Sequence, residues 1–444
     1  MDLTIDNYAN HIATLSHSYT NALQYVANEG PAAVLVHSGA EHHYYGDDRG
    51  VSFQAFGHLL HWIPVNRPNQ FIYFRPGEKP VYFQIVPSDF WYEQDIDLEP
   101  EWEAALTIVR LSSLDELSAQ LKQHSLADVA YIGGHTDIAA SLGIDKKLIN
   151  PKRLLAYLDF SRAVKTDYEL EQLRAANRLA LLGHAAAKTC FLEGGSEFEI
   201  HMAFLQTTQS LEDECPYTNI VALNEKAAIL HYQFKRRTNV DKGQVLLIDA
   251  GCRINAYGSD ITRTSISADV HPVFRSLVAA MEVLELELVD EVRPGNTYQS
   301  LHELSLMKIA HVLIEHNICT GDVSDLVKLN IPQLFMPHGV GHLLGIQVHD
   351  VGGRQSDING AIMLPSENSP ALRNTRLMEA DMVFTVEPGL YFIPLILEAE
   401  RGSARGRLIN WNAVDELYPC GGIRIEDNIR VTSSGSENLT HQFE

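Results

Sequence analysis

The sequence has few cysteines, no long apolar run and a shortage of basic residues. Its five cysteines are scattered through 444 residues without a CxxC pair, which indicates reduced thiols rather than disulfides or a zinc ribbon. No uncharged apolar stretch is long enough to span a bilayer, and the first residues lack the basic and apolar regions of a secretory signal. We therefore expect a cytoplasmic protein without a membrane partner.

Acidic residues outnumber basic ones, with 57 Asp and Glu against 34 Lys and Arg and a formal net charge of −23. Binding to a phosphate backbone needs a basic patch, so we expect no nucleic-acid partner. The charge is typical of a well-solvated surface. Because 444 residues exceed what one hydrophobic core usually holds, two domains are expected.

The patterns along the chain predict an α/β (α+β) protein, with a mixed α/β accessory domain over residues 1–160 and a second domain over 161–444. The boundary lies just before Thr166 and Glu169, which form the pattern of a helix capping box, and Ser196 and Glu199 repeat that pattern. Strands are expected at 32–36, 70–74, 81–86 and 129–132, and helices at 114–124, 271–291 and 299–316.

Five residues of the second part stand in strand-like stretches punctuated by glycine or proline, and together they indicate the ligand set of a two-metal hydrolase. Burying four carboxylates together without a counter-charge would be costly, and two divalent cations would supply that charge. Carboxylate-rich sites suit hard ions such as Mn(II). The five residues are Asp249, Asp260, His342, Glu387 and Glu426.

Taken singly, the two aspartates also allow a structural role. Asp249 ends the apolar run 245–248, where an aspartate can equally form a turn or cap a helix. Asp260 is followed by a threonine-rich stretch that favours a strand. A hairpin between the two stretches would let both carboxylates converge.

The two glutamates stand in extended segments. Pro388 disfavours helix at Glu387 and holds that residue at a strand end. Residues 422–429 alternate strictly, so Arg424 and Glu426 share one face of a strand. For this strand alone, a solvated face of charged residues is the simpler interpretation.

Three histidines fall within one span of twelve residues, 338–349, beside glycines. His338 and His342 have a spacing that can bind zinc on a helix, but Gly339 and Gly341 make a helix poor and indicate a loop. The dinucleotide pattern GxGxxG is not met, because the next glycine comes one position too late. With His349, this density of histidines favours a functional role over a structural one.

Together these segments closely resemble the pita-bread metallopeptidases, and within them the bacterial Xaa-Pro dipeptidase (prolidase) group, which includes the organophosphorus acid anhydrolases. The resemblance covers the C-terminal two-thirds of the chain. The motifs that carry it are Asp249-Ala-Gly, Tyr257-x-x-Asp260-Ile-Thr-Arg-Thr, Pro337-His-Gly-Val-Gly-His342, Val348-His349-Asp350, Thr385-Val-Glu-Pro-Gly-Leu-Tyr-Phe392 and Gly421-Gly-Ile-Arg-Ile-Glu-Asp-Asn428.

The resemblance implies a metal-dependent dipeptidase that cleaves the imide bond before a C-terminal proline. It assigns the five ligands to two metal ions, usually Mn(II), with a bridging hydroxide, and it makes Glu387 the general base as well. The other implied contacts are to substrate: His231, His338 and His349 at the substrate and the developing oxyanion, Tyr217 in the pocket wall, and Arg373 and Arg424 at the terminal carboxylate.

The N-terminal part departs more from the family. Related enzymes have a Tyr-Pro-Phe-Lys-Val-Asn-Pro-like stretch where this chain has residues 49–57, although Asp47 and Asp48 just before it are retained. In the family this loop can reach the active site of the partner subunit. The resemblance thus implies a homodimer, a role of residues 1–160 in oligomerisation, and a substrate contact for Asp48.

Two other enzymatic activities stay open on the residues alone. The same hydroxide could attack phosphorus in organophosphates and cleave P–F or P–O bonds, as a promiscuous or main activity. An aminopeptidase acting on longer Xaa-Pro peptides is the other alternative. A catalytically inactive binding domain is disfavoured, because such proteins lose ligands and all five are present here.

Overall fold

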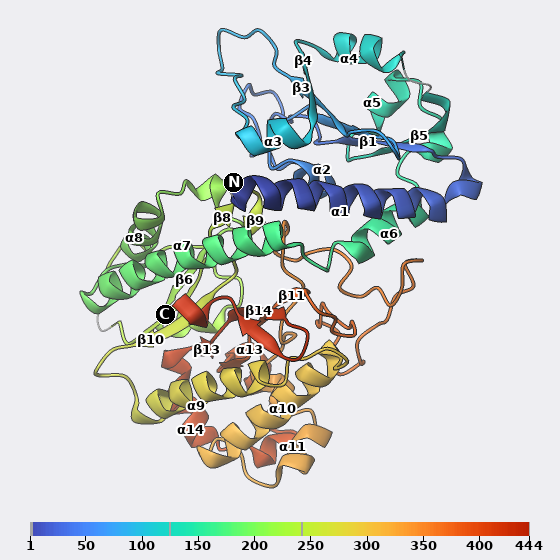
Figure 1. Ribbon diagram of the computed structural model, residues 1–444. Coiled ribbons are helices and arrows are strands. Elements are labelled where there is room, and N and C mark those ends of the chain that lie inside the picture. The colour runs from blue at the N-terminus through green and yellow to red at the C-terminus, as the bar shows by residue number, and fades with distance from the viewer. Residues whose placement is uncertain (1–2, 124–125, 241–242, 444) are drawn as a thin grey trace. The chain divides into compact units, whose positions relative to one another are not determined.

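The computed structural model describes residues 3–123, 126–240 and 243–443, and it divides the chain into two compact units (Figure 1). The first unit comprises Met1–Glu171 with Asp357–Ala361, and the second comprises Gln172–Ser356 with Ile362–Glu444. The division into functional domains at residue 160 stays a prediction. Within the described ranges, no helix is long and apolar enough to cross a membrane.

The first unit is built on one mixed five-stranded sheet with the strand order β4-β3-β2-β1-β5. The strands β1 and β2 pair antiparallel, as do β2 and β3, whereas β5 and β4 pair parallel with β1 and β3. The bounds are β1 (Ala33–His37), β2 (Phe71–Phe74), β3 (Val81–Ile85), β4 (Thr107–Leu111) and β5 (Val129–Ile132). The four strands predicted here are confirmed to within one residue at each end.

Six α-helices of the first unit accompany this sheet in the described ranges. The predicted helix at 114–124 is observed as α4, which ends at Leu121, and residue 124 lies outside the described residues. The helices are α1 (Leu3–Tyr25), α2 (Gly57–Trp62), α3 (Pro100–Ala105), α4 (Leu114–Leu121), α5 (Thr136–Ser141) and α6 (Lys152–Ser161).

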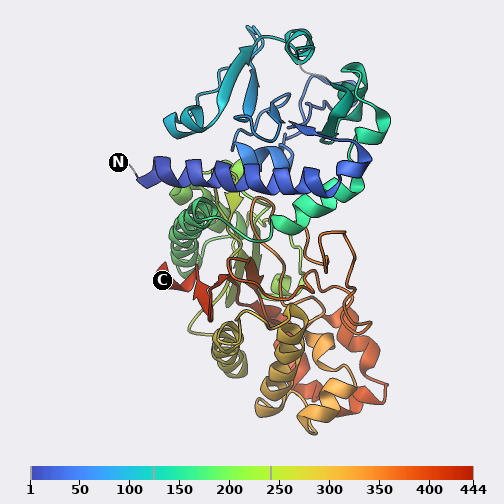
Figure 2. The same ribbon diagram turned by 45° about the vertical axis from the view of Figure 1, so that its right-hand side comes forward.

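The second unit contains several small sheets whose strands come from distant parts of the chain (Figure 2). One has the order β10-β7-β6, another β11-β14-β15, and two further pairs are β12-β13 and β8-β9. The bounds are β6 (Ile220–Leu223), β7 (Val245–Asp249), β8 (Arg253–Ile254), β9 (Tyr257–Gly258), β10 (Thr262–Ile266), β11 (Val383–Val386), β12 (Gly389–Tyr391), β13 (Gly422–Arg424), β14 (Asp427–Val431) and β15 (Ser436–Asn438).

The long helices begin where local sequence signals place them. The backbone N–H of Thr166 donates to Glu169 at 2.8 Å at the start of α7, and Ser196 and Glu199 cap α8 reciprocally. The helices predicted at 271–291 and 299–316 are observed as α9 and α10. The bounds are α7 (Asp167–Leu192), α8 (Glu197–Thr208), α9 (Pro272–Val289), α10 (Tyr298–Glu315), α11 (Val323–Lys328), α12 (Pro332–Phe335), α13 (Pro394–Leu397) and α14 (Trp411–Leu417).

The strand β7 separates two apolar clusters. Leu246 and Ile248 pack with side chains of α7 and α8 in one cluster, whereas Leu247 packs with Tyr232 and Tyr391 in another. Because successive side chains of a strand point to opposite faces, Asp249 lies on the same face as Leu247, away from the two helices. Strand alternation therefore decides on which side of the sheet this carboxylate stands.

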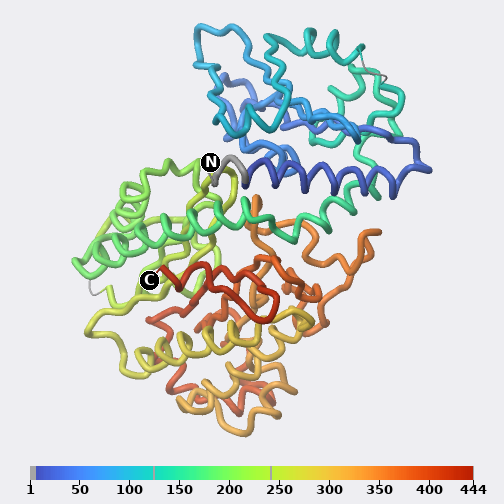
Figure 3. The backbone as a smooth tube through the Cα atoms, viewed as in Figure 1, coloured from blue at the N-terminus to red at the C-terminus, as the bar shows by residue number. Residues whose placement is uncertain are grey.

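Between Leu343 and Val383 the chain forms no helix and only isolated bridges, and the tube in Figure 3 shows this stretch as a long irregular excursion in orange. It carries His349 and Arg373. Long loops without secondary structure are uncommon in compact domains and are usually functional.

Candidate metal centre

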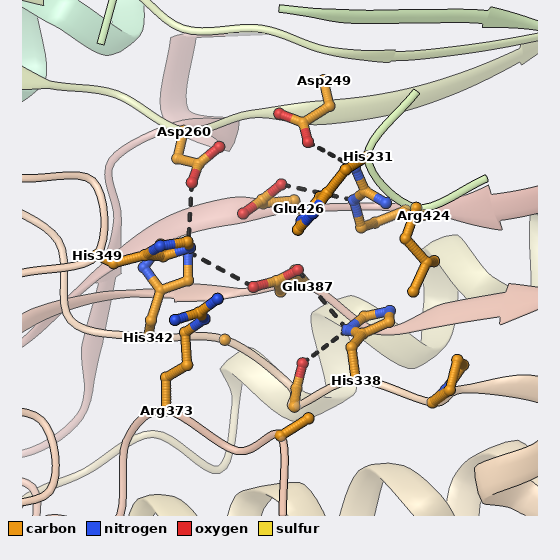
Figure 4. A pocket seen from close by; sticks show the side chains of 15 residues that line it. His231, Asp249, Asp260, His338, His342, His349, Arg373, Glu387, Arg424 and Glu426 are labelled. Carbon is orange, nitrogen blue, oxygen red and sulfur yellow. Dashed lines mark hydrogen bonds and ion pairs between the residues drawn. The ribbon is translucent and has the colours of Figure 1, made fainter. Parts of the chain in front are cut away.

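A cavity of about 270 Å³ in the second unit is lined by all five predicted metal ligands (Figure 4). Asp249 pairs with Thr262 where β7 and β10 run antiparallel, and Asp260 lies two residues before that threonine. The predicted antiparallel pairing of the two stretches is confirmed. Asn428 accepts a hydrogen bond from the backbone N–H of Asp260 at 3.1 Å, which fixes the chain where it enters the cavity.

The two glutamates follow strand ends in the same cavity wall. Glu387 comes directly after β11, as predicted. Glu426 lies between β13 and β14, its backbone N–H donates to the carbonyl of Thr262 at 3.1 Å, and its Oε2 accepts from the hydroxyl of Thr262 at 2.5 Å. Arg424 and Glu426 are only 5% and 2% exposed. The interpretation of this face as solvated is thus wrong, because β10 covers it.

His342 stands in a loop, as its glycines indicated. Gly341 has φ +146°, and a side-chain carbon there would lie 2.3 Å from the carbonyl oxygen of Thr385, so only glycine fits. The Nδ1 atom of His342 lies 3.0 Å from the carbonyl oxygen of Leu343, which assigns the proton to Nδ1. Its Nε2 then faces Asp260 Oδ2 at 3.3 Å and Glu387 Oε1 at 3.6 Å, free to ligate.

The donor set fits divalent metal ions. Ligand atoms of Asp260, His342 and Glu426 all lie within 4.8 Å of one another. The Oδ1 atom of Asp249 is buried, and within the described ranges no donor meets it in good hydrogen-bond geometry, which is costly for a carboxylate unless a cation meets it. Four carboxylates face one buried guanidinium here, and carboxylate oxygens with one imidazole suit hard to borderline dications.

The pKa values of the carboxylates show what their crowding costs. Burial raises the pKa of Asp249 to about 6, with Arg424 opposing this shift, and it raises the pKa of Glu387 to about 7. Burial and the neighbouring carboxylates raise the pKa of Glu426 well above its usual value. Burial would also raise the pKa of Asp260, but the imidazole of His342, with Tyr217 and His349, outweighs it and lowers that pKa. Without cations the cluster therefore favours taking up protons.

The guanidinium of Arg424 is engaged by protein groups at all three nitrogens. Its Nη2 lies 2.5 Å from Asp249 Oδ2, its Nη1 donates to the hydroxyl of Tyr391 at 2.9 Å, and its Nε donates to the hydroxyl of Thr262 at 3.0 Å. Tyr391 and Thr262 were not identified from the sequence. Thr262 could have been found, because it stands two residues after Asp260 and shares its strand face.

Arg373 differs from Arg424 in both exposure and partners. It is exposed, lines the same cavity, and its guanidinium makes no hydrogen bond or ion pair within the part of the chain that the structure describes. In Figure 4 its side chain points into the cavity beside His342. Its charge is thus available to a bound anion.

Three histidines that were predicted to contact substrate also line the cavity. His338 donates from Nδ1 to the carbonyl of Gly339 at 2.7 Å, and burial and Arg424 lower its pKa to about 3. His349 packs edge-on against His342 with ring centroids 4.4 Å apart, and burial lowers its pKa to about 4. Both rings are therefore neutral at pH 7, while His231 enters the cavity from the loop after β6.

Two other predicted substrate contacts do not line the cavity. Tyr217 lies behind the carboxylates, and burial, followed by the charges of Asp249 and Asp260, raises the pKa of its hydroxyl. Asp48 is an exposed residue of the first unit. The roles of both residues stay predictions.

Comparison with known proteins places the chain among metallopeptidases. Residues 171–433 match metallopeptidase family M24, and residues 6–160 match the N-terminal domain of Xaa-Pro dipeptidases. An Xaa-Pro dipeptidase of Shewanella oneidensis is 40% identical over 98% of this chain and 99% of its own length. One from Shewanella baltica is also 40% identical, over 100% of this chain and 99% of its own.

Solved structures agree with this at the level of the fold. Zinc-substituted Escherichia coli aminopeptidase P in complex with product has a TM-score of 0.74 and 23% identity, and the match covers 97% of this chain and 96% of that chain. Proline aminopeptidase P II from Yersinia pestis has a TM-score of 0.72 and 24% identity, with 97% of each chain covered. The predicted pita-bread architecture is thereby confirmed.

Proposed function

This chain belongs to metallopeptidase family M24, and we propose that it is a metal-dependent Xaa-Pro dipeptidase that cleaves the imide bond before a C-terminal proline. Family membership implies divalent metal ions. The observation that carries the proposal is the convergence of four carboxylates and the Nε2 of His342 on one cavity. The curated relatives named above support the substrate class, and they do not favour organophosphate hydrolysis or an aminopeptidase activity.

The residues of the cavity have distinct proposed tasks. When bound, two divalent ions held by the five ligands would lower the pKa of a shared water and polarise the scissile carbonyl. Glu387 would accept the proton of that water and pass it to the leaving nitrogen of proline, because its carboxylate lines the cavity beside the other ligands. His231 and His349, which both line the cavity, would stabilise the developing oxyanion as hydrogen-bond donors.

The size of the substrate is proposed to be set by a cation that meets its terminal carboxylate. Arg373 supports this role better than Arg424, because Arg373 has no partner within the described residues and Arg424 is held by Asp249 and Tyr391. A guanidinium can bind a carboxylate through two parallel hydrogen bonds. A peptide that continues beyond proline would place an amide there and leave the charge without a partner.

We further propose that the ions are Mn(II) and that the protein is a cytoplasmic homodimer. The oxygen-rich ligand set supports Mn(II), and the five free cysteines support a reducing compartment. The first unit exposes Tyr45, Phe90 and Trp91, at 106%, 86% and 77%, which supports an interaction surface there. Elemental analysis of the purified protein and light scattering on a sizing column test the metal and the dimer.

One assay decides the proposed function. Protein stripped with chelator and reloaded with Mn(II) is compared on a Xaa-Pro dipeptide, the matching Xaa-Pro amide and a tripeptide with proline in the second position. Turnover of the dipeptide alone, lost with chelator and restored by Mn(II), is the expected result. Equal or faster turnover of the tripeptide would contradict a dipeptidase.

A further inference from the structure

One buried carboxylate outside the cavity joins both ends of the loop that carries His231. Glu197 is the first residue of α8 and is 0% exposed. Its Oε1 accepts from the backbone N–H of Leu223 at 3.0 Å, and its Oε2 accepts from the backbone N–H of Arg236 at 2.7 Å. Leu223 ends β6 and Arg236 lies 13 positions later, so a single side chain closes the loop.

The charge of Glu197 is balanced within the same loop. Arg236 donates to Oε1 of Glu197 from Nε at 3.0 Å and from Nη2 at 2.7 Å, and Nη2 also donates to the carbonyl of Leu223 at 2.9 Å. The carbonyl of Arg236 accepts from the backbone N–H of Phe198 at 3.1 Å. Charge-assisted, two-point bonds of this kind fix geometry as well as adding stability.

A third bond reaches the residue next to His231. Tyr232 donates its hydroxyl to Oε2 of Glu197 at 2.9 Å. Its ring is 5% exposed and packs with Leu247 and Tyr391. Because His231 directly precedes Tyr232, the anchor fixes the backbone from which the imidazole of His231 enters the cavity.

We propose that Glu197 is a positioning residue for the reaction, acting on His231 through Tyr232 and Arg236. Among the described residues, its carboxylate accepts five hydrogen bonds from the two ends of this loop and from Tyr232 within it. Glu197 does not line the cavity, so it acts through the loop and not on the substrate. The inference rests on the proposed function, since that function gives His231 its task.

Two variants and one matched control test this role by steady-state kinetics on a Xaa-Pro dipeptide with the Mn(II)-loaded enzyme. Tyr232→Phe removes the hydrogen bond to Glu197 and leaves the ion pair of Glu197 with Arg236 intact. Glu197→Gln replaces the carboxylate by a neutral amide and so removes the charge that Arg236 meets. Each should lower kcat by about 10-fold or more with little change in KM, because misplacing an oxyanion donor affects the transition state. The control Glu199→Gln disturbs the cap of the same helix. In the described part of the chain its carboxylate accepts hydrogen bonds from Ser196 only, so kcat should stay unchanged.

Combining each substitution with His231→Ala distinguishes an effect on the position of His231 from a general effect on the stability of the protein. If Glu197 and Tyr232 act through His231, neither substitution should lower kcat further in the His231→Ala background. Fully additive losses would overturn the proposal, as would an equal loss in Glu199→Gln. Should Glu197→Gln fail to fold, Tyr232→Phe decides the question by the same criterion.

A readout that needs no substrate keeps this inference separate from the proposed function. Amide hydrogen exchange of residues 224–236 should be faster in Tyr232→Phe and Glu197→Gln than in wild type, while peptides of β7 and β10 keep their protection. Unchanged exchange in this loop would overturn the positioning role even for an active enzyme. An inactive wild-type enzyme with the expected exchange pattern would instead contradict the dipeptidase assignment.

Discussion

The guanidinium of Arg424 joins Asp249 to Tyr391: Nη2 lies 2.5 Å from the carboxylate, and Nη1 lies 2.9 Å from the hydroxyl. The hydroxyl in turn lies 3.1 Å from Nε2 of His338. Arg424 thus holds one candidate metal ligand directly and, through Tyr391, one histidine of the cavity wall. We therefore assign the proposed capture of a substrate carboxylate to Arg373 and not to Arg424.

The two arginines are therefore expected to differ in kind when each is replaced. Arg373→Met should raise KM for a Xaa-Pro dipeptide by roughly 10- to 100-fold, the scale of losing a hydrogen bond between charged groups. The variant enzyme should also show a smaller preference for the free acid over the Xaa-Pro amide. Arg424→Met should lower activity and metal content together and keep the preference for the free acid. The ratio of kcat/KM for acid and amide measures both, and a lost preference in Arg424→Met would return the capture role to Arg424.

Replacing a single metal ligand is expected to abolish activity without unfolding the protein. Asp260→Asn and Glu387→Gln keep the size of the side chain and remove its charge, so metal binding and proton uptake should fail while packing is retained. Circular dichroism, metal analysis and turnover, measured on the same samples, test this. Near wild-type turnover by Asp260→Asn would rule out the two-metal assignment.

His349 is expected to act on the transition state and not as a ligand. Its ring packs against that of His342 and stands beside the ligand cluster. His349→Ala should lower kcat by roughly 10²-fold, the scale of losing one oxyanion donor, with metal stoichiometry unchanged. One metal ion fewer per subunit in this variant would move His349 into the ligand set.

Acid pH is expected to destabilise the fold through buried neutral histidines. His302 is 2% exposed, and burial lowers its pKa to about 4, whereas an unfolded chain has a histidine pKa of about 6.5. Between these values the unfolded state binds the proton and the folded state does not, so stability present above pH 6.5 is lost as the pH falls to 4. The loss amounts to roughly 3 kcal/mol for this one group.

Urea unfolding of chelator-treated protein at pH 7 and at pH 4 measures the effect. In His302→Gln the difference in unfolding free energy between the two pH values should shrink by that amount. The exposed His17 offers a matched control, and His17→Gln should leave the difference as in wild type. An unchanged difference in His302→Gln would contradict a buried neutral imidazole.

Local signals in the sequence were enough to place many elements correctly. The capping boxes at Thr166 and Ser196 start helices where predicted, because a cap is satisfied by residues three positions apart. The strand end at Glu387 and the loop at His342 follow from proline and glycine, whose backbone limits act on their own and adjacent residues. The motifs around the five ligands predicted the family because each motif can be recognised within a few consecutive residues.

The stretch at residues 422–429, predicted as one strand and observed as β13 and β14, shows what local signals could not decide. Alternating charged and apolar residues describe a solvated face and a buried functional face equally well, and this stretch taken alone favoured the first. Arg424 and Glu426 are buried because residues 249 and 262, more than 160 positions away, pack against them.

The sequence by itself determined which residues could bind metal and where strands and helices begin, because short-range backbone and capping preferences govern both. Only the tertiary structure decided which side chains remain free. It paired Arg424 with Asp249 and left Arg373 open to the cavity, and it placed Glu197 under the loop of His231. Such pairings depend on burial and on contacts between distant segments, which local residue preferences do not encode.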